Sequence, residues 1–365
     1  SPPTGRVDGC GCICREITGD GRMRFNPKDD DSRQSIEDYL EETGNQEEFD
    51  SYNNSVYAWN PNEDDTKILR VTKSKLGTFG WCREQYYLES FHGMRGEQRY
   101  YHDRGLNVHD MVEYFWDEFK ETEAAVELIN TGELKKAKKL LFDVIATPPE
   151  PFAYGEEEQI AQWVDWQFER LKVTKGIGWR PAKVEANIHA TRFVEVDGVG
   201  IPIHMRGYID TIFDTTEGGY ALMELKTGKW KSNKMSSMRK EMGFYRMMLE
   251  YSKHQEFLPI THWGWEFPGG GIEGGEGPKI YYEDVKSGGK FAMKSVEKSL
   301  EKLVRAHIEM DFPPDPWMMK KRPDETLEDM LANKRMKCSW CDYTEQCSFW
   351  SITEGFLDKI IKEDE

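Results

Sequence analysis

Asp210, Glu224 and Lys226 are the residues whose types and spacing most directly suggest chemistry. They lie in two short stretches, 206–210 and 221–228, that read as two β-strands joined by a turn. Side chains alternate along a strand, so Glu224 and Lys226 share a face on which Asp210 can converge. Two carboxylates can hold divalent cations while an amine steadies an attacking hydroxide or phosphate charge, as metal-assisted phosphodiester hydrolysis requires. The alternative is an ordinary hairpin with an Asp at its turn and an exposed Glu/Lys pair.

A basic run follows this hairpin directly. Seven basic residues and one acidic residue, Glu241, lie between Lys226 and Arg246, for a local charge of +6. Such a run is often a solvated face, but next to a phosphodiester site we interpret it as a groove that follows a nucleic-acid backbone, with Lys229 as a contact. Trp230 within the run could stack on a base or pack inside the protein.

Three cysteines near the C-terminal end form a second pattern of interest. Cys338, Cys341 and Cys347 have the spacing C-x₂-C-x₅-C, which is typical of metal ligands. Three thiolates leave a four-ligand site one short, and the cysteine outside the N-terminal region that could complete it is Cys82. Zinc and a four-iron cluster both accept four thiolates, and a chance group of structural cysteines is the remaining alternative.

The elements that must position these residues follow from hydrophobic periodicity and turn signals. We expect a short helix at 84–89, a long one at about 105–130 with His109 on its buried stripe beside Leu106 and Val112, and further helices at 134–144 and 156–171. β-Structure should occupy 183–213, with a turn at Asp197-Gly198. A helix at 236–251, a strand at 262–267 and a Lys-rich helix at 286–310 complete the pattern.

Composition bounds the class of protein. The chain has 365 residues, 38% of them hydrophobic, which is enough for a sizeable core in one large domain or two. Its net charge of −17 argues against binding of nucleic acid by the protein surface as a whole. It does not exclude a binding groove in which basic residues are concentrated. No apolar run approaches a membrane span, and the first residues lack the pattern of a secretory signal. Seven cysteines do not suggest a disulfide framework, so we expect a reducing, intracellular and cytoplasmic setting.

Three segments of different character divide the chain. Residues 1–70 are acidic and irregular, with Cys10, Cys12 and Cys14 among glycines, and we expect a flexible extension. Residues 71–350 should form the catalytic domain, with a helical insertion at about 115–180 and a staple that joins Cys82 to 338–347. Residues 351–365 form an acidic tail.

Together, the ordered motifs resemble the PD-(D/E)xK nucleases, in particular the RecB-like branch that carries an iron–sulfur cluster. That branch includes the CRISPR-associated iron–sulfur nucleases, the AddB nuclease domain and eukaryotic single-strand exonucleases. Gly105 to His109 is similar to the family's G-x-x-x-H segment, Val184-Glu185 to its acidic residue before the hairpin, and Glu224 to Gly228 to its (D/E)-x-K-T-G core. Arg206 to Asp210 resembles G-x-x-D, and the four cysteines match the cluster ligands.

The resemblance implies an α/β, restriction-endonuclease-like fold with a mixed central sheet flanked by helices, an added helical region and a C-terminal cysteine segment. It implies an Mg²⁺- or Mn²⁺-dependent exonuclease on single-stranded DNA, with a [4Fe-4S] cluster and a role in DNA repair or CRISPR-type processing beside a helicase or other proteins. The implied catalytic residues are Asp210, Glu224 and Lys226. The implied metal ligands are His109, Asp210, Glu224 and the Leu225 carbonyl, and Glu185 is a supporting residue.

One position departs from the family. Its usual Q-x-x-x-Y segment is replaced here by Glu241 to Tyr245, which still places the two side chains on one helix face. Glu241 keeps an acceptor oxygen but loses the amide donor and adds charge. Two other classes remain open: an inactive nucleic-acid-binding subunit of a larger complex, and a hydrolase whose cysteines bind zinc.

Overall fold

The computed structural model describes residues 56–59, 67–97, 99–117, 121–145, 155–174, 176–268 and 280–350. It divides the chain into two compact units, each discontinuous in sequence. We call the described parts of Ser1–Glu97, Thr191–Arg206 and Glu297–Glu365 the cysteine unit, and those of Gln98–Ala190 and Gly207–Val296 the hairpin unit. Cys10, Cys12, Cys14 and the tail 351–365 lie outside the described residues.

The cysteine unit contains the start of the central sheet. β1 (Tyr57–Trp59) pairs antiparallel with β2 (Lys67–Thr72), and β2 pairs in parallel with the first part of β4 (Val199–Asp214), Leu69 opposite Ile203. Ile68 and Leu69 are fully buried. The expectation that all of 1–70 is a flexible extension is therefore wrong at its C-terminal end, because Ile68 and Leu69 supply apolar surface to the core.

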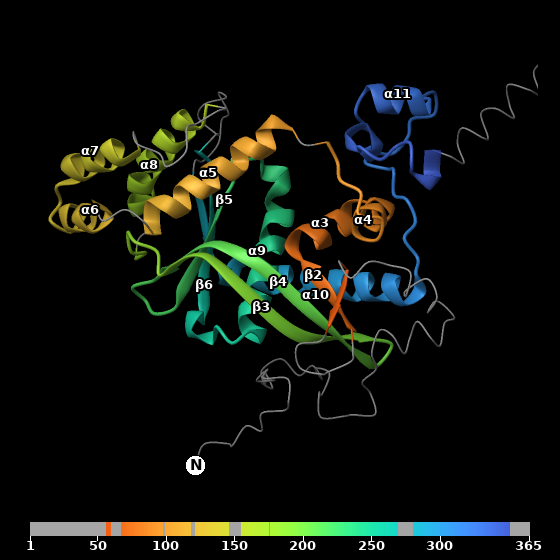
Figure 1. Cartoon of the computed structure of the whole chain (residues 1–365), viewed down its shortest axis with the longest axis horizontal. Helices are drawn as coiled ribbons and strands as arrows, with labels where there is room; N and C mark the ends of the chain where they lie inside the picture. The colour runs from red at the N-terminus through yellow and green to blue at the C-terminus, as the bar shows by residue number, and fades with distance from the viewer. Residues whose placement is uncertain are drawn as a thin grey trace, which may run out of the picture. The chain divides into compact units, whose positions relative to one another are not determined.

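Two helices follow β2 (Figure 1). α3 (Lys73–Trp81) begins where the Thr72 side chain accepts a hydrogen bond from the Lys75 amide, and α4 (Arg83–Ser90) starts directly after Cys82. Cys82 has an extended backbone between them and serves as the C-cap of α3 and the N-cap of α4. The predicted helix at 84–89 is confirmed, with Cys82 at its start.

A buried histidine lies at the centre of the aromatic core of this unit. His307, on α10 (Val285–Glu309), is fully buried, with Tyr57 Oη 2.5 Å from its Nδ1 and Tyr86 Oη 2.8 Å from its Nε2. Phe91 and Phe312 pack against the ring, with centroids 5.4 and 5.2 Å from that of His307. A neutral imidazole has one donor and one acceptor nitrogen, so one tyrosine donates to the ring and the other accepts from it.

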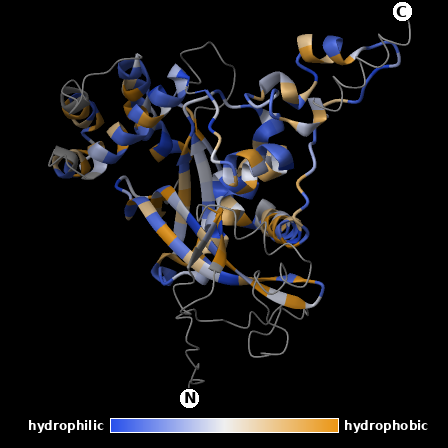
Figure 2. Cartoon of the chain, turned by 45° about the vertical axis from the view of Figure 1, so that its right-hand side comes forward, coloured by the Kyte–Doolittle hydropathy of each residue, from blue (hydrophilic) through white to orange (hydrophobic). Residues whose placement is uncertain are grey.

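The hairpin unit carries the other end of the sheet. β4 pairs antiparallel with β5 (Tyr220–Leu225), β5 in parallel with β6 (Ile260–Glu266), and β6 antiparallel with β7 (Ile280–Asp284). β3 (Lys183–Val196) pairs with β4, and residues of both strands belong to both units. The turn between them, which belongs to the cysteine unit, has positive φ at Asp197 and Gly198, as the sequence predicted. Figure 2 shows the alternation of polar and apolar residues along these two strands. Since parallel and antiparallel pairs both occur, the sheet is mixed.

Helix α9 (Met235–Tyr251) packs closely on this sheet. A Cβ added at Gly207 would lie 3.0 Å from Met248 Cε, so a glycine at the start of the R-G-Y-I-D segment allows α9 to approach β4. Met242, Met247 and Met248 on the inner face of α9 are fully buried.

Four described helices lie between α4 and β3 in sequence: α5 (Tyr100–Asp117), α6 (Glu121–Asn130), α7 (Leu134–Ile145) and α8 (Glu156–Val173). The last three lie in the added helical region expected at about 115–180. Val108, Trp116 and Trp163 form part of a buried cluster that joins α5 to α8. The single helix expected at 105–130 is wrong, because the structure has two helices there. Leu106, expected on the buried stripe, is 61% exposed.

The α/β prediction is confirmed: a mixed sheet is flanked by helices. No helix within the described residues is long and apolar enough to cross a membrane.

Candidate active site and cysteine site

Asp210 is held at the edge of the β4–β5 pair. Its Oδ2 accepts a hydrogen bond of 2.7 Å from the Leu225 amide, so the carboxylate of one strand is fixed by the backbone at the end of the next. The side chain remains 14% exposed. This is the convergence of Asp210 on the Glu224-x-Lys226 segment that the strand pattern predicted.

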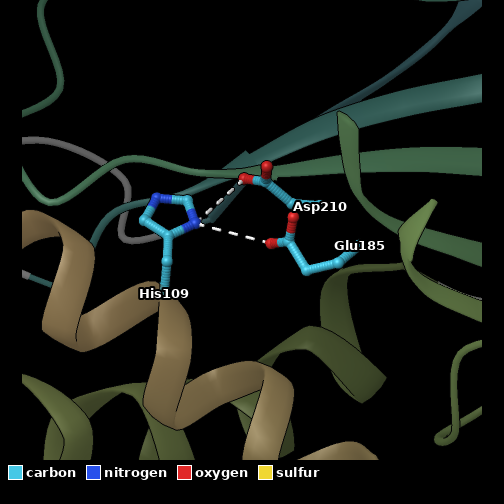
Figure 3. A group of neighbouring side chains, drawn as sticks. All are labelled: His109, Glu185 and Asp210. Atoms are coloured by element: carbon cyan, nitrogen blue, oxygen red, sulfur yellow. Dashed lines mark ion pairs between the residues drawn. The ribbon is translucent and has the colours of Figure 1, made fainter. Parts of the chain in front are cut away.

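His109 reaches the same place from helix α5. Its Nδ1 lies 3.8 Å from Asp210 Oδ2 and 3.8 Å from Glu185 Oε1. Figure 3 shows the imidazole and the two carboxylates pointing toward one another. One ligand atom from each of the three residues lies within 4.8 Å of the others, the spacing of a metal-binding group. His109 is thus a half-buried side chain at the site and not a core residue.

Gly105 lies where helix α5 approaches the loop that follows β5. A Cβ added at Gly105 would lie 3.4 Å from Thr227 Oγ1, so this turn of α5 runs against the Lys226-Thr227-Gly228 loop. Residues i and i+4 share a helix face, so His109 points the same way as Gly105. The G-x-x-x-H spacing therefore places both residues on the side of α5 that faces this loop.

Glu185 joins the group through an unusual backbone. It is in strand β3 yet has φ of 42°, a left-handed conformation that is strained for a residue with a side chain. Backbone strain of this kind is often found at functional sites. There it directs a side chain to a position that it would not reach from a regular strand. The sequence analysis suggested Glu185 only as a supporting acid. No pattern in the sequence predicts the positive φ of this residue.

The electrostatics of the trio suit a cation. Burial lowers the pKa of His109, but the carboxylates of Glu185, Asp210 and Glu224 outweigh it and raise the pKa overall. The site is therefore strongly negative. Carboxylate oxygens with an imidazole nitrogen form a ligand set that Mn²⁺ accepts, and carboxylates serve Mg²⁺.

Glu224 and Lys226 form a second, adjoining arrangement. Lys226 Nζ lies 3.0 Å from Glu224 Oε1 and 2.7 Å from Glu241 Oε2, and the Lys226 amide donates to the Glu266 carbonyl. Burial lowers the pKa of Lys226, but the two carboxylates raise it above its ordinary value overall. Lys226 is therefore a charged donor of hydrogen bonds and cannot accept a proton.

Tyr245 holds Glu224 from the other side. It lies one helical turn after Glu241 on α9, is buried, and its hydroxyl hydrogen-bonds the Glu224 carboxylate. Burial and the negative charges of Glu224 and Asp210 raise its pKa, so it stays protonated. Glu224 thus lies against Lys226 and Tyr245, whereas the close trio consists of His109, Glu185 and Asp210.

Comparison with known proteins fits this arrangement. A family model described as the PD-(D/E)XK nuclease superfamily matches residues 70–348. The chain belongs to the PD-(D/E)XK nuclease superfamily. A solved structure titled "Crystal structure of SSO0001" is 11% identical with a TM-score of 0.27, over 76% of this chain and 86% of that one. A search of the curated proteins finds no match.

Membership of this superfamily makes the chain a nuclease that uses divalent metal ions to hydrolyse phosphodiester bonds in nucleic acid. The ligand atoms of His109, Glu185 and Asp210 lie close enough together to hold such an ion.

The basic run after the hairpin is less available to nucleic acid than its charge suggests. Arg239 forms a two-pronged ion pair with Glu283, and Arg246 pairs with Glu250, both acids outside the run. Lys231 and Lys234 are exposed. Trp230 stacks on Tyr281 with ring centroids 6.2 Å apart, which answers the open question in favour of packing.

All four predicted cysteines meet in the cysteine unit. Cys82, Cys338, Cys341 and Cys347 are free thiols that line one cavity together with Trp81, Pro314 and Tyr343. Cys338 lies within a 3-10 turn, η5 (Lys337–Trp340), and Cys341 is its C-cap. Lys337 Nζ donates to the Trp81 carbonyl, which connects this turn to the segment before Cys82. Residues more than 250 positions apart in sequence therefore supply one set of sulfurs.

Glu84 connects the first and last of these cysteines. Its carboxylate accepts hydrogen bonds from the Ser348 amide at 2.6 Å and the Ser348 hydroxyl at 2.8 Å, and lies 3.4 Å from Cys347 Sγ. Burial raises the pKa of Cys341 to about 11 and that of Cys347 to about 12. Metals bind thiolates, so a metal group would release the protons of these two thiols on binding. Sequence spacing had no means of finding Glu84.

Proposed function

We propose that this nuclease is an Mg²⁺- or Mn²⁺-dependent deoxyribonuclease that degrades single-stranded DNA from an end. The observation that supports it most is the convergence of His109, Glu185 and Asp210, from one helix and two strands. The Leu225 amide, which precedes Lys226 in the chain, bonds to Asp210 in this group. His109, Glu185 and Asp210 would hold the ion. Glu224 and the Leu225 carbonyl, expected from the sequence as ligands, border the same place.

When bound, a divalent ion supplies Lewis-acid activation of the phosphate and lowers the pKa of a water molecule. The chain's own residues do the positioning. Lys226, held between Glu224 and Glu241, donates hydrogen bonds to the attacking oxygen or to the phosphate oxygens. Tyr245 fixes Glu224, and the Leu225 amide fixes Asp210, so little reorganisation is needed when substrate binds.

Single-stranded DNA labelled at either end, incubated with Mn²⁺, tests this function and reveals the direction of cutting. Asp210→Ala and Lys226→Ala should abolish degradation. Asp214→Ala, an exposed residue at the end of the same strand, is the matched control and should leave it intact. Equal degradation by wild type and the Asp210 and Lys226 variants, or none by wild type, contradicts the proposal.

We further propose that Cys82, Cys338, Cys341 and Cys347 hold a [4Fe-4S] cluster. Four free thiols on one cavity are a fitting donor set. Within the described part of the chain, no three of these sulfurs lie within 4.8 Å of one another. Sulfurs around a zinc ion with bonds of about 2.3 Å lie roughly 3.8 Å apart, so the cavity as formed favours the larger group.

Iron and zinc analysis of protein purified without oxygen tests this assignment. A brown protein with about four irons is expected, and Cys341→Ser should lose both colour and iron. A colourless, zinc-loaded protein would refute the cluster. Free thiols and a DNA-processing site suit an intracellular role in repair or CRISPR-type processing, beside a helicase or similar partner.

A further inference from the structure

Tyr208 is exposed in the immediate neighbourhood of the metal centre. It is 47% exposed, whereas its strand neighbour Ile209 is 1% exposed. Side chains at i and i+2 of a strand lie on one face, so Tyr208 stands beside Asp210, about 7 Å along β4. A large aromatic ring is thus exposed to solvent two residues before Asp210, on the same face of the strand.

Helix α5 presents a second exposed aromatic toward the same region. Tyr101 precedes Gly105 by one turn and His109 by two, so the three share a helix face. Gly105 lies against Thr227, and His109 lies 3.8 Å from Asp210. This face of α5 is therefore directed toward the site. Tyr101 is 40% exposed and lies about 12 Å along the helix from His109.

The surroundings of Tyr101 suit a charged backbone. Arg99 donates a hydrogen bond of 3.2 Å to the Tyr101 hydroxyl, and Arg104 lies 5.9 Å from the ring of the neighbouring Tyr100. Exposed aromatic rings interleaved with cations are the composition of surfaces that bind single-stranded nucleic acid, where rings stack on bases and cations meet phosphates.

We propose that Tyr208 and Tyr101 stack on the bases that flank the phosphate at the metal centre, and that this stacking selects single-stranded over duplex DNA. A base in a duplex has both faces covered by its neighbours, so only an unpaired, splayed base can offer a face to tyrosine. The inference rests on the proposed function and assigns its strand preference to two named residues.

Single-turnover cleavage by Tyr208→Ala and Tyr101→Ala tests the inference. The matched control is Phe291→Ala, because Phe291 is an aromatic residue that is 77% exposed on another helix, α10. Each stacking variant should raise the KM for single-stranded DNA by roughly tenfold or more, and Tyr208→Phe should restore it. The control should behave as wild type.

Two further substrates separate stacking from a structural role. On an oligonucleotide that lacks the bases beside the scissile phosphate, wild type and the alanine variants should have equal KM, since no base remains to stack. The preference for single-stranded over duplex substrate should shrink in Tyr208→Ala. An equal loss on normal and abasic substrates, or no loss on either, overturns the inference.

Failure of this inference is distinguishable from failure of the proposed function. If Asp210→Ala abolishes cleavage while the tyrosine variants keep wild-type KM and strand preference, the nuclease proposal holds and stacking is refuted. If Asp210→Ala cleaves as well as wild type, the proposed function itself fails.

Discussion

Lys226 lies between two carboxylates, with its Nζ 2.7 Å from Glu241 Oε2 on α9 and 3.0 Å from Glu224 Oε1 on β5. Glu241 occupies the position where the related nucleases that the chain resembles have glutamine. Glu241 forms an ion pair with Lys226. The glutamate that departs from the family pattern therefore has a partner of opposite charge.

Substitution of Glu241 separates charge from geometry. Glu241→Gln keeps an acceptor oxygen for Lys226 and should retain activity within a few-fold of wild type. Glu241→Ala removes the acceptor and should lower kcat by about tenfold or more, the worth of a hydrogen bond to a charged group. Steady-state cleavage of labelled DNA measures both. Glu250→Gln, which removes the partner of Arg246 on the same helix, is the control. Equal losses in the Gln and Ala variants would show that charge matters more than the hydrogen bond.

Removal of Glu185 tests its place in the trio. Glu185→Ala should weaken Mn²⁺ binding by about tenfold or more, since one of three converging ligand groups is lost. Calorimetric titration without DNA measures this independently of activity. Glu195→Ala, at an exposed position on the same strand, should bind Mn²⁺ as wild type does. Unchanged Mn²⁺ affinity in Glu185→Ala would show that Glu185 does not bind the metal ion and has a structural role.

Arg170 anchors the added helices to the sheet. It is fully buried on α8, bonds the carbonyls of Gly178 and Trp179, lies over Phe213, and is 3.8 Å from buried Glu266. Trp163 and Gln167 also donate to Glu266, whose backbone carbonyl receives the Lys226 amide. One buried network therefore joins α8 to the end of β5, where Lys226 follows Glu224 and Leu225.

Breaking this network should be costly. Arg170→Met leaves a buried carboxylate without its cation and should lower the free energy of unfolding by about 3–5 kcal/mol. Adding Glu266→Gln should recover part of the loss, because the uncompensated charge is removed. Urea unfolding measures both variants. Arg305→Met, which breaks exposed pairing with Asp197, should cost far less stability than Arg170→Met. A double variant no more stable than Arg170→Met would exclude the charge explanation.

The buried His307 should make stability depend on pH. Burial lowers its pKa to about 3, against about 6.5 in an unfolded chain. Between those values the unfolded state binds a proton that the folded state does not, so stability falls as pH falls below about 6.5. From pH 6.5 to 5.0 this contribution is about 2 kcal/mol.

Urea unfolding at several pH values measures this slope. His307→Gln lacks the titrating ring, so its stability should change less between pH 6.5 and 5.0 than that of wild type, even though the variant is less stable overall. Parallel pH curves for the two proteins would show that other groups cause the dependence.

The sequence determined most of the local elements and predicted most of the candidate site residues. Alternation along the strands joined Asp210 to the Glu224-x-Lys226 segment, and cysteine spacing singled out Cys82 with the C-terminal three. Periodicity was less reliable on α5, where it placed Leu106 in the core. Leu106 is exposed because Val108, Met111 and Phe115 carry the packing against α8.

Tertiary structure alone decided which groups share the site. The positive φ of Glu185 brings it to His109 and Asp210, a conformation that no propensity predicts because the surrounding fold imposes it. Glu241 meets Lys226, and Glu84 meets Cys347, across 15 and 263 residues of sequence. Contacts at such separations depend on how whole elements pack. The sequence therefore specified the chemical groups of this nuclease, while packing specified their partners.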